Sequence, residues 1–376
     1  MKRHPRIGLA GILFAVPLFV LGMGGSAWAD SQNNNGNNDH GGDDGKCKTS
    51  HCVPHQHKPL TLKEQGNFYV GGRIELRSPN TTNAALPGDG TAPGHIAVYQ
   101  ANVQYQIPVD QKYKYPIVLM HGGGHTANIF MSTPDGREGW FTSLTRRGFA
   151  VYAVDGPNRG RSGWDPTARI QATIGQAPAS DMQGVNIYTE EGAWTGFRWG
   201  PTFGTFYDNT QFPKDYVEAY IRQIQPAYRN LPAPAEQVEN NAMRDDLRAL
   251  IDRIGPCILL GWSTGSTNVM QAASSATYAP KVKGLIGIEG FQASSGGDPN
   301  VVKTIPQLTV IGDHSNPTNQ QAWSATINGL GGDSTTVYLP DVGIHGNGHT
   351  MMAELNNEQI ADLLEDWIRS HVKHVK

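Results

Sequence analysis

Charge is scarce in this sequence: 17% of its 376 residues are Asp, Glu, Lys or Arg, and the formal net charge is −3. No block of Lys or Arg stands out after residue 6. Proteins bind nucleic acid chiefly by neutralising phosphates with clustered basic residues, so this composition offers no electrostatic basis for a nucleic-acid partner. The 45 glycines and 24 prolines also exclude a helical bundle, because both residues disfavour helix interiors.

Cysteine and long apolar runs are scarce too. Of the three cysteines, Cys257 lies alone in the apolar run 257–260, which predicts a buried free thiol rather than a catalytic one. Cys47 and Cys52 lie close together in a polar segment and could close a small disulfide loop in an exported chain. No stretch after residue 29 is long and apolar enough to span a bilayer, so no stable membrane insertion is expected.

The first 29 residues are typical of a signal peptide. Lys2 and Arg6 belong to a positively charged start, an apolar run covers 7–20, and Ala27-Trp28-Ala29 reads as a small-residue cleavage site. The alternative is an uncleaved membrane anchor, but the apolar run is short and is interrupted by a proline. Cleavage after Ala29 predicts a protein of the periplasm or of the medium.

Residues 30–60 are rich in Asn, Gly, Asp and His, and they are too polar to bury a core. We therefore expect a disordered leader. Its possible donors to zinc or copper are Cys47, His51, Cys52, His55 and His57. A solvated linker with one small disulfide is the favoured interpretation of the same residues.

Strand-like and helix-like segments alternate from residue 61 to residue 376. This alternation predicts an α/β domain with a mostly parallel central sheet flanked by helices. The expected strands are 68–76, 96–107, 115–120, 150–154, 257–262, 282–288, 308–311 and 336–339, and the expected helices are 138–147, 238–254, 266–275 and one near the C-terminus with apolar residues from Ile360 to Ile368. An interruption at about 163–235, rich in Gly, Pro and aromatic residues, is expected to form a cap, whose aromatic side chains would line a substrate pocket or simply pack the cap onto the core.

The strongest chemical signal is Gly261-Trp262-Ser263-Thr264-Gly265. It follows an expected buried strand and precedes an expected helix, which is the setting of a nucleophile elbow. The glycines allow a sharp turn that lifts the Ser263 hydroxyl above the sheet edge. We therefore expect Ser263 to be a nucleophile.

A second signal is His121-Gly122-Gly123-Gly124-His125, directly after an expected strand. A nucleophile that attacks a carbonyl creates an oxyanion, which backbone N–H groups must stabilise. The N–H groups of Gly123 and Thr264 are the expected donors. A phosphate-binding loop is the rival interpretation, but no Lys followed by Ser or Thr ends the motif.

A serine nucleophile needs a base and an acid. His349, in the loop before the last expected helix, is the expected base, and His345 is the alternative. Glu289 and Asp313 each follow a strand, at the sheet edge where open α/β sheets place their sites. Both keep the chain order Ser, acid, His, so the residues alone do not decide which of the two is the acid.

These motifs resemble the α/β-hydrolase superfamily over the chain from about residue 65 to its end. The resemblance is carried by the segments 121–123, 155–162 and 261–265 and by His349. More narrowly, 133–137, 160–162, 289–290 and 346–349 are similar to a small branch of exported bacterial esterases. That branch takes its acid from a Glu after the strand that follows the nucleophile helix, which implies Glu289 here and leaves Asp313 a supporting role. The branch can carry adjacent cysteines where this chain has Gly123-Gly124.

The resemblance implies an exported serine hydrolase that cleaves carboxylic esters through Ser263, His349 and Glu289 and an acyl-enzyme intermediate. It needs no metal and no organic cofactor, and its expected partner is a small-molecule ester substrate. An amidase or lactonase on the same triad is one alternative, and a non-catalytic binding or metal-scavenging protein is another. The oligomeric state, monomer or homodimer, stays open.

Overall fold

The computed structural model describes residues 59–77, 94–181, 184–229 and 233–376. The expected signal peptide and residues 30–58 of the expected leader, with their cysteines and histidines, lie outside the described residues. The cleavage site, the small disulfide and the leader's metal site therefore stay predictions.

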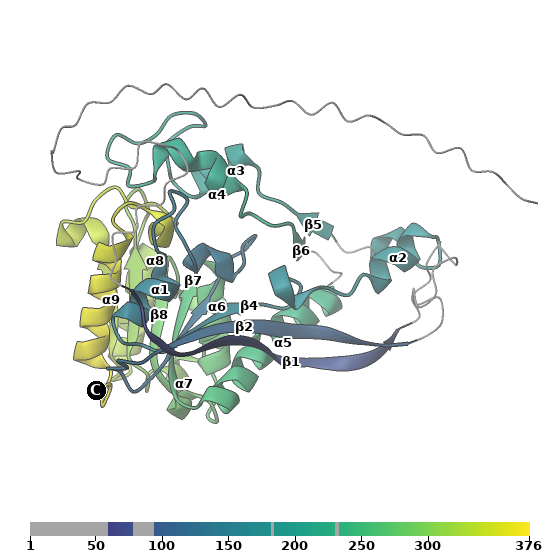
Figure 1. Ribbon diagram of the computed structural model, residues 1–376, viewed down its shortest axis with the longest axis horizontal. Helices are drawn as coiled ribbons and strands as arrows, with labels where there is room; N and C mark the ends of the chain where they lie inside the picture. Colours follow the sequence, from purple (N-terminus) through teal and green to yellow (C-terminus); the bar gives the residue numbers. More distant parts are fainter. Residues whose placement is uncertain (1–58, 78–93, 182–183, 230–232) are drawn as a thin grey trace, which may run out of the picture. The chain divides into compact units, whose positions relative to one another are not determined.

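Eight strands of the described chain form one sheet, in the order β1-β2-β4-β3-β7-β8-β9-β10 (Figure 1). Their bounds are β1 Leu62–Arg77, β2 Gly94–Pro108, β3 Ile117–Met120, β4 Val151–Asp155, β7 Cys257–Trp262, β8 Val282–Ile288, β9 Gln307–Ile311 and β10 Ser334–Tyr338. Neighbouring strands from β4 to β10 are parallel, whereas β2 runs antiparallel to both β1 and β4. The predicted α/β fold with a mostly parallel sheet is confirmed.

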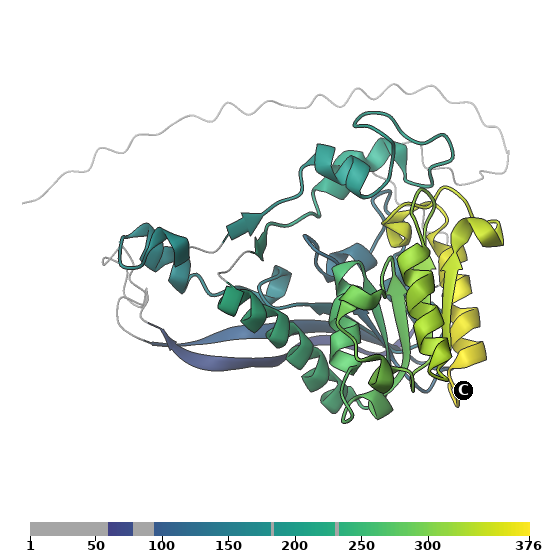
Figure 2. The same ribbon diagram turned by 180° about the vertical axis from the view of Figure 1, so that it is seen from behind.

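Helices cover both faces of this sheet (Figures 1 and 2). Their bounds are α1 Trp140–Arg146, α5 Ala233–Ile254, α6 Thr264–Ala273, α7 Pro299–Val302, α8 Thr318–Gly329 and α9 Asn357–His371. Side chains of α1 and α9 belong to one hydrophobic core, and those of α5, α6, α7 and α8 belong to the other. Because both faces are covered, the central strands β3 and β7 are buried along their whole length and read as continuous apolar runs.

The expected cap is an insertion between β4 and β7. It contains α2 Thr167–Thr173, β5 Gly184–Asn186, α3 Glu190–Gly196, α4 Val217–Ile221 and β6 Ala227–Arg229. β5 and β6 pair as a small antiparallel ribbon. Backbone hydrogen bonds attach the cap to loops that follow strands of the large sheet, as in Gln225 N–H to Gly124 O and His349 N–H to Phe197 O.

The aromatic side chains of the cap mostly pack it together. The buried ones are Trp194, Phe197, Trp199, Phe212 and Tyr220. Among the described residues, the exposed aromatic side chains of the cap are Phe203, Tyr216 and Trp164, with 50%, 44% and 37% of their surfaces exposed. Packing of the cap therefore accounts for most of this aromatic cluster.

Cys257 in β7 is buried and free, as predicted. Burial raises the pKa of its thiol to about 12, so no nucleophilic thiolate forms near neutral pH. Within the ranges described, no helix is both long and apolar enough to cross a membrane.

A buried carboxyl group joins α5 to the long edge strand. Asp246 is 2% exposed, and its Oδ1 accepts a hydrogen bond from the Gly72 N–H at 3.1 Å. Gly71 and Gly72 both have positive φ, and a Cβ on Gly71 would collide with Asp246 Oδ1. Burial and the neighbouring charge of Asp245 raise the pKa of Asp246 to about 8. Oδ2 has no hydrogen-bond partner among the described residues.

We predict that Asp246→Asn stabilises the protein increasingly as pH rises from 4 to 8. The amide oxygen keeps the bond to Gly72, while the variant has no charge to bury. In the wild type the folded pKa lies above the unfolded value, so stability falls by about 1.4 kcal/mol per pH unit across this window. Urea unfolding of the variant and the wild type at pH 5 and pH 8 measures the difference in their free energies of unfolding, with exposed Asp110→Asn as control. A difference in unfolding free energy that does not change with pH would contradict the prediction.

Candidate active site

Ser263 stands between the last residue of β7 and the first residue of α6. Its backbone has φ 54° and ψ −122°, a strained conformation for a residue with a side chain. The Ser263 N–H donates to Ile288 O of β8 at 2.8 Å. A Cβ on Gly265 would lie 2.4 Å from Met120 O, so this glycine is required by close packing. The strand, the strained serine and the helix form the elbow that the sequence predicted.

Glu289 follows β8 directly and also has a positive φ of 56°. The side chain of Glu289 is 5% exposed, and its carboxylate lies at the edge of the sheet. Oε1 accepts a hydrogen bond from the Gly312 N–H at 2.6 Å. Oε2 lies 3.4 Å from His349 Nδ1 and 2.6 Å from Arg198 Nη2. Glu289 and His349 are thus adjacent, and the guanidinium of Arg198, which belongs to the cap, contacts the same oxygen, Oε2.

The surroundings of Glu289 act on its ionisation in opposite directions. Burial favours the neutral acid, but the neighbouring imidazole of His349, the charge of Arg198 and the Gly312 N–H outweigh it and hold the pKa of Glu289 below its ordinary value. The carboxylate is therefore ionised near neutral pH.

Asp313, the other candidate acid, has different partners. Its Oδ2 accepts from Asn209 Nδ2 and from the Gly346 N–H, both at 3.1 Å. The same oxygen lies 3.7 Å from Nδ1 of His345, whose side chain is largely exposed. Asp313 therefore fastens a cap loop to the loop before His349, and no contact between Asp313 and His349 is present in the described chain.

The backbone of His349 is held from both sides. Its N–H donates to Phe197 O at 2.8 Å, and its carbonyl accepts from Trp262 Nε1 at 2.6 Å. The Phe197 ring lies parallel to the imidazole, with centroids 5.7 Å apart. Because Trp262 immediately precedes Ser263, the elbow itself fixes the loop that carries the histidine.

A second buried carboxyl group supports the same loop. Glu354 accepts hydrogen bonds from the Gly348 N–H at 2.9 Å and from Asn347 Nδ2 at 2.7 Å. Burial raises its pKa to about 7, although these two donors favour the charged form. Glu354 thus anchors the two residues immediately before His349.

The glycine loop after β3 is fixed by its carbonyl groups. His121 Nδ1 donates to Gly122 O at 2.8 Å, and His125 Nδ1 donates to Gly123 O at 2.9 Å. In a trans peptide the N–H points away from the carbonyl, so the bond from His121 also sets the direction of the Gly123 N–H. No acceptor among the described residues binds the Gly123 or the Thr264 N–H.

Both histidines of this loop are neutral structural bridges. His121 Nε2 accepts from the Gly156 N–H at 3.2 Å, and His125 Nε2 accepts from the Tyr220 hydroxyl at 2.9 Å. Burial lowers the pKa of each histidine to about 4, so each keeps one donor and one acceptor nitrogen at neutral pH. The second bridge ties the glycine loop to α4 of the cap.

The sequence did not identify all the residues that surround Glu289 and His349. Arg198 pairs with Glu289 in a largely buried position, and no sequence pattern marks it as a partner of that carboxylate. Tyr220 gave no signal of its own. Glu354 lies five residues after His349 in sequence, and that spacing is the only hint it offered.

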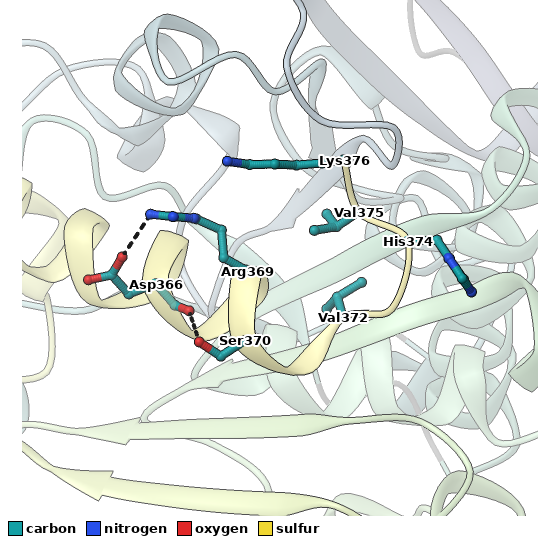
Figure 3. A pocket seen from close by; sticks show the side chains of 7 residues that line it. All are labelled: Asp366, Arg369, Ser370, Val372, His374, Val375 and Lys376. Carbon is teal, nitrogen blue, oxygen red and sulfur yellow. Dashed lines mark hydrogen bonds and ion pairs between the residues drawn. The ribbon is translucent and has the colours of Figure 1, made fainter.

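A surface pocket elsewhere has no part in this arrangement (Figure 3). Its lining residues are Asp366, Arg369, Ser370, Val372, His374, Val375 and Lys376. Val372 packs near Gly284 at the start of β8, and Lys114 N–H donates to Val375 O. The pocket thus lies at the amino ends of the strands, whereas Ser263 and Glu289 follow carboxyl ends.

No protein-family model matches the chain. A solved structure described as that of a novel bacterial esterase is similar to it, with 32% sequence identity, coverage of 84% of this chain and 98% of that chain, and a TM-score of 0.75. The chain belongs to the α/β-hydrolase superfamily. A further relative, a probable secreted lipase named phiG from Fungal sp. (strain ATCC 74256), is 25% identical over 366 residues, which cover 80% of this chain and 88% of the relative.

We predict that His121→Ala lowers kcat for a p-nitrophenyl ester about 100-fold, with a smaller change in KM. The Gly123 peptide loses the bond that sets its direction, and loss of one oxyanion donor, the role expected of the Gly123 N–H, costs about that factor. Steady-state kinetics measure the effect. His95→Ala, at an exposed position of β2, is the control. A wild-type kcat in His121→Ala would show that the peptide is held without the imidazole.

Proposed function

We propose that this protein, a carboxylic ester hydrolase of the esterase/lipase type, works through Ser263 as nucleophile, His349 as base and Glu289 as acid. The observation that carries the proposal is the position of His349, with Nδ1 next to Glu289 and its backbone bonded to Trp262 beside the elbow serine. The three side chains come from three loops at one edge of the sheet, where open α/β folds hold their sites.

The reaction follows from this arrangement. Ser263 Oγ attacks the ester carbonyl carbon while His349 Nε2 takes its proton, which forms a tetrahedral intermediate. The N–H groups of Gly123 and Thr264 stabilise the oxyanion, and α6 contributes the positive end of its dipole. The intermediate collapses, the C–O bond to the alcohol breaks, and the proton passes from His349 to the leaving oxygen. Water then attacks the acyl-enzyme by the same route and releases the acid.

Glu289 supports this cycle without taking the proton. Its carboxylate lies next to Nδ1, so it keeps the proton of neutral His349 on that nitrogen and leaves Nε2 free to act as base. It also stabilises the imidazolium that forms in each half of the reaction. Its low exposure strengthens this attraction because little water screens it.

The substrate is a small-molecule ester, as the relatives' names support for this chain. We also propose export to the periplasm or the medium, which the signal-like start of the sequence and the secreted relative support. No step of the reaction requires a metal or an organic cofactor.

We predict that a fluorophosphonate probe labels Ser263, and that Ser263→Ala abolishes both labelling and ester hydrolysis. The probe reacts only with a serine whose proton a neighbouring base removes. Mass spectrometry of the labelled protein maps the adduct, and Ser370→Ala on α9 is the matched control. An adduct at another serine, or full turnover by Ser263→Ala, would refute the proposed nucleophile.

We predict that Glu289→Gln lowers kcat by about 100-fold to 10,000-fold, whereas Asp313→Asn retains most activity. The amide favours the wrong tautomer of His349 in the first variant, while the second changes a loop attachment alone. Parallel kinetics of both variants with one p-nitrophenyl ester decide between the carboxylates. The reverse order of effects would assign the acid to Asp313.

A further inference from the structure

The cap supplies a charged side chain to the proposed acid. Arg198 follows helix α3, and its Nη2 lies 2.6 Å from Glu289 Oε2. That oxygen is also the one nearest His349 Nδ1, at 3.4 Å. A single carboxylate oxygen therefore faces both the base and a permanent cation.

The backbone of Arg198 has a left-handed conformation that directs its side chain to this contact. Its φ of 59° is uncommon for a residue with a side chain and is a strained conformation that the surroundings must support. The N–H of Arg198 donates to Thr195 O at the end of α3. The left-handed turn thus brings the guanidinium back from the cap to the sheet edge, where 18% of its side chain remains exposed.

The residue before Arg198 contacts the base. Phe197 O accepts the His349 N–H, and its ring stacks on the imidazole. A Cβ on Gly348 would lie 2.5 Å from Phe197 O, so the loop before His349 packs closely on the same turn. One cap turn, residues 197–198, therefore touches both the acid and the base.

Resting on the proposed triad, we propose that Arg198 is a positioning residue through which the cap holds Glu289 ionised and oriented, so that the cap completes the catalytic machinery instead of only covering it. Arg198 touches no reacting atom. It acts through Glu289, by binding the oxygen that faces His349 and by opposing the addition of a proton to the Glu289–His349 pair.

This role has a consequence for the pH profile. Removing the cation makes it easier for the pair to take up a proton, whichever partner receives it, and uptake by either one stops catalysis. The acid limb of kcat/KM should then move to higher pH. The other titratable groups nearby are Glu354, Tyr338, Asp313, His345 and His125. The charge of Arg198 also lowers the pKa of Glu354 and of Tyr338, so its removal favours the protonated form of these two groups as well.

The test compares Arg198→Met and Arg198→Lys with the wild type in kcat/KM from pH 4 to pH 9 on a p-nitrophenyl ester. We expect Arg198→Met to move the acid limb upward by about one pH unit or more. Arg198→Lys, which keeps the charge but not the planar fork, should restore the wild-type midpoint with a lower kcat. The control is Arg222→Met, an exposed cap arginine paired with Glu218 on α4, which should leave the profile unchanged.

Superimposable acid limbs for Arg198→Met and the wild type would overturn the proposal, even if kcat or thermal stability fell. A limb that moves in Arg198→Met and stays displaced in Arg198→Lys would also overturn it, because charge would not be the cause. Thermal melts verify folding, and Arg198→Gln replaces the Met variant if that variant is unfolded. Absence of a fluorophosphonate adduct at Ser263 of the wild type would instead refute the proposed function, so the two failures are distinguishable.

Discussion

The arrangement of this site depends on one buried carboxylate. The side chain of Glu289 is almost fully buried, and its backbone is left-handed. It has three different partners, and each belongs to a separate part of the chain. The neighbouring strand β9 ends at Ile311 and provides the Gly312 N–H, the cap provides Arg198, and the loop before α9 provides His349. A buried charge is costly unless its oxygens are satisfied, so these segments must come together for the sheet edge to form as it does.

Around this carboxylate, the structure uses neutral groups to fix the backbone. His121 and His125 each donate to one carbonyl of the glycine loop and accept one further hydrogen bond, and burial prevents either from becoming charged near neutral pH. His349 has the same side chain but a carboxylate beside it. The same residue type thus acts as a rigid bridge in one setting and as the proposed base in the other, and the difference lies in its partners.

Much of this could be predicted from the sequence, because the signals were local. The apolar runs of β3 and β7, the spacing of Ile360 and Leu364 in α9, and the elbow at Ser263 each express geometry within a few residues. Helix α8 was missed because its sequence is mostly polar and small, with Trp323 and Ile327 buried on its core side.

The partners of the site could not be predicted in the same way. Glu289 and Asp313 follow adjacent parallel strands and are equivalent by pattern, so only the family resemblance favoured Glu289. In the fold Glu289 lies next to His349, whereas Asp313 binds a cap loop. Arg198 depends on a left-handed turn at a residue that is not glycine, and sequence patterns do not reveal such strain. Contacts between the cap and the sheet edge join residues far apart in the chain, with no periodicity to mark them.

The cap is a single insertion between β4 and β7, as is typical of a separable module. A lid that merely enclosed the substrate could be exchanged for another without altering the chemistry beneath it. In this protein an exchange would also remove a partner of Glu289, the acceptor for the His349 N–H and the Tyr220 bridge to the glycine loop. If the proposed triad operates, replacing the cap should therefore change catalytic power together with substrate range unless the turn at 197–198 is preserved.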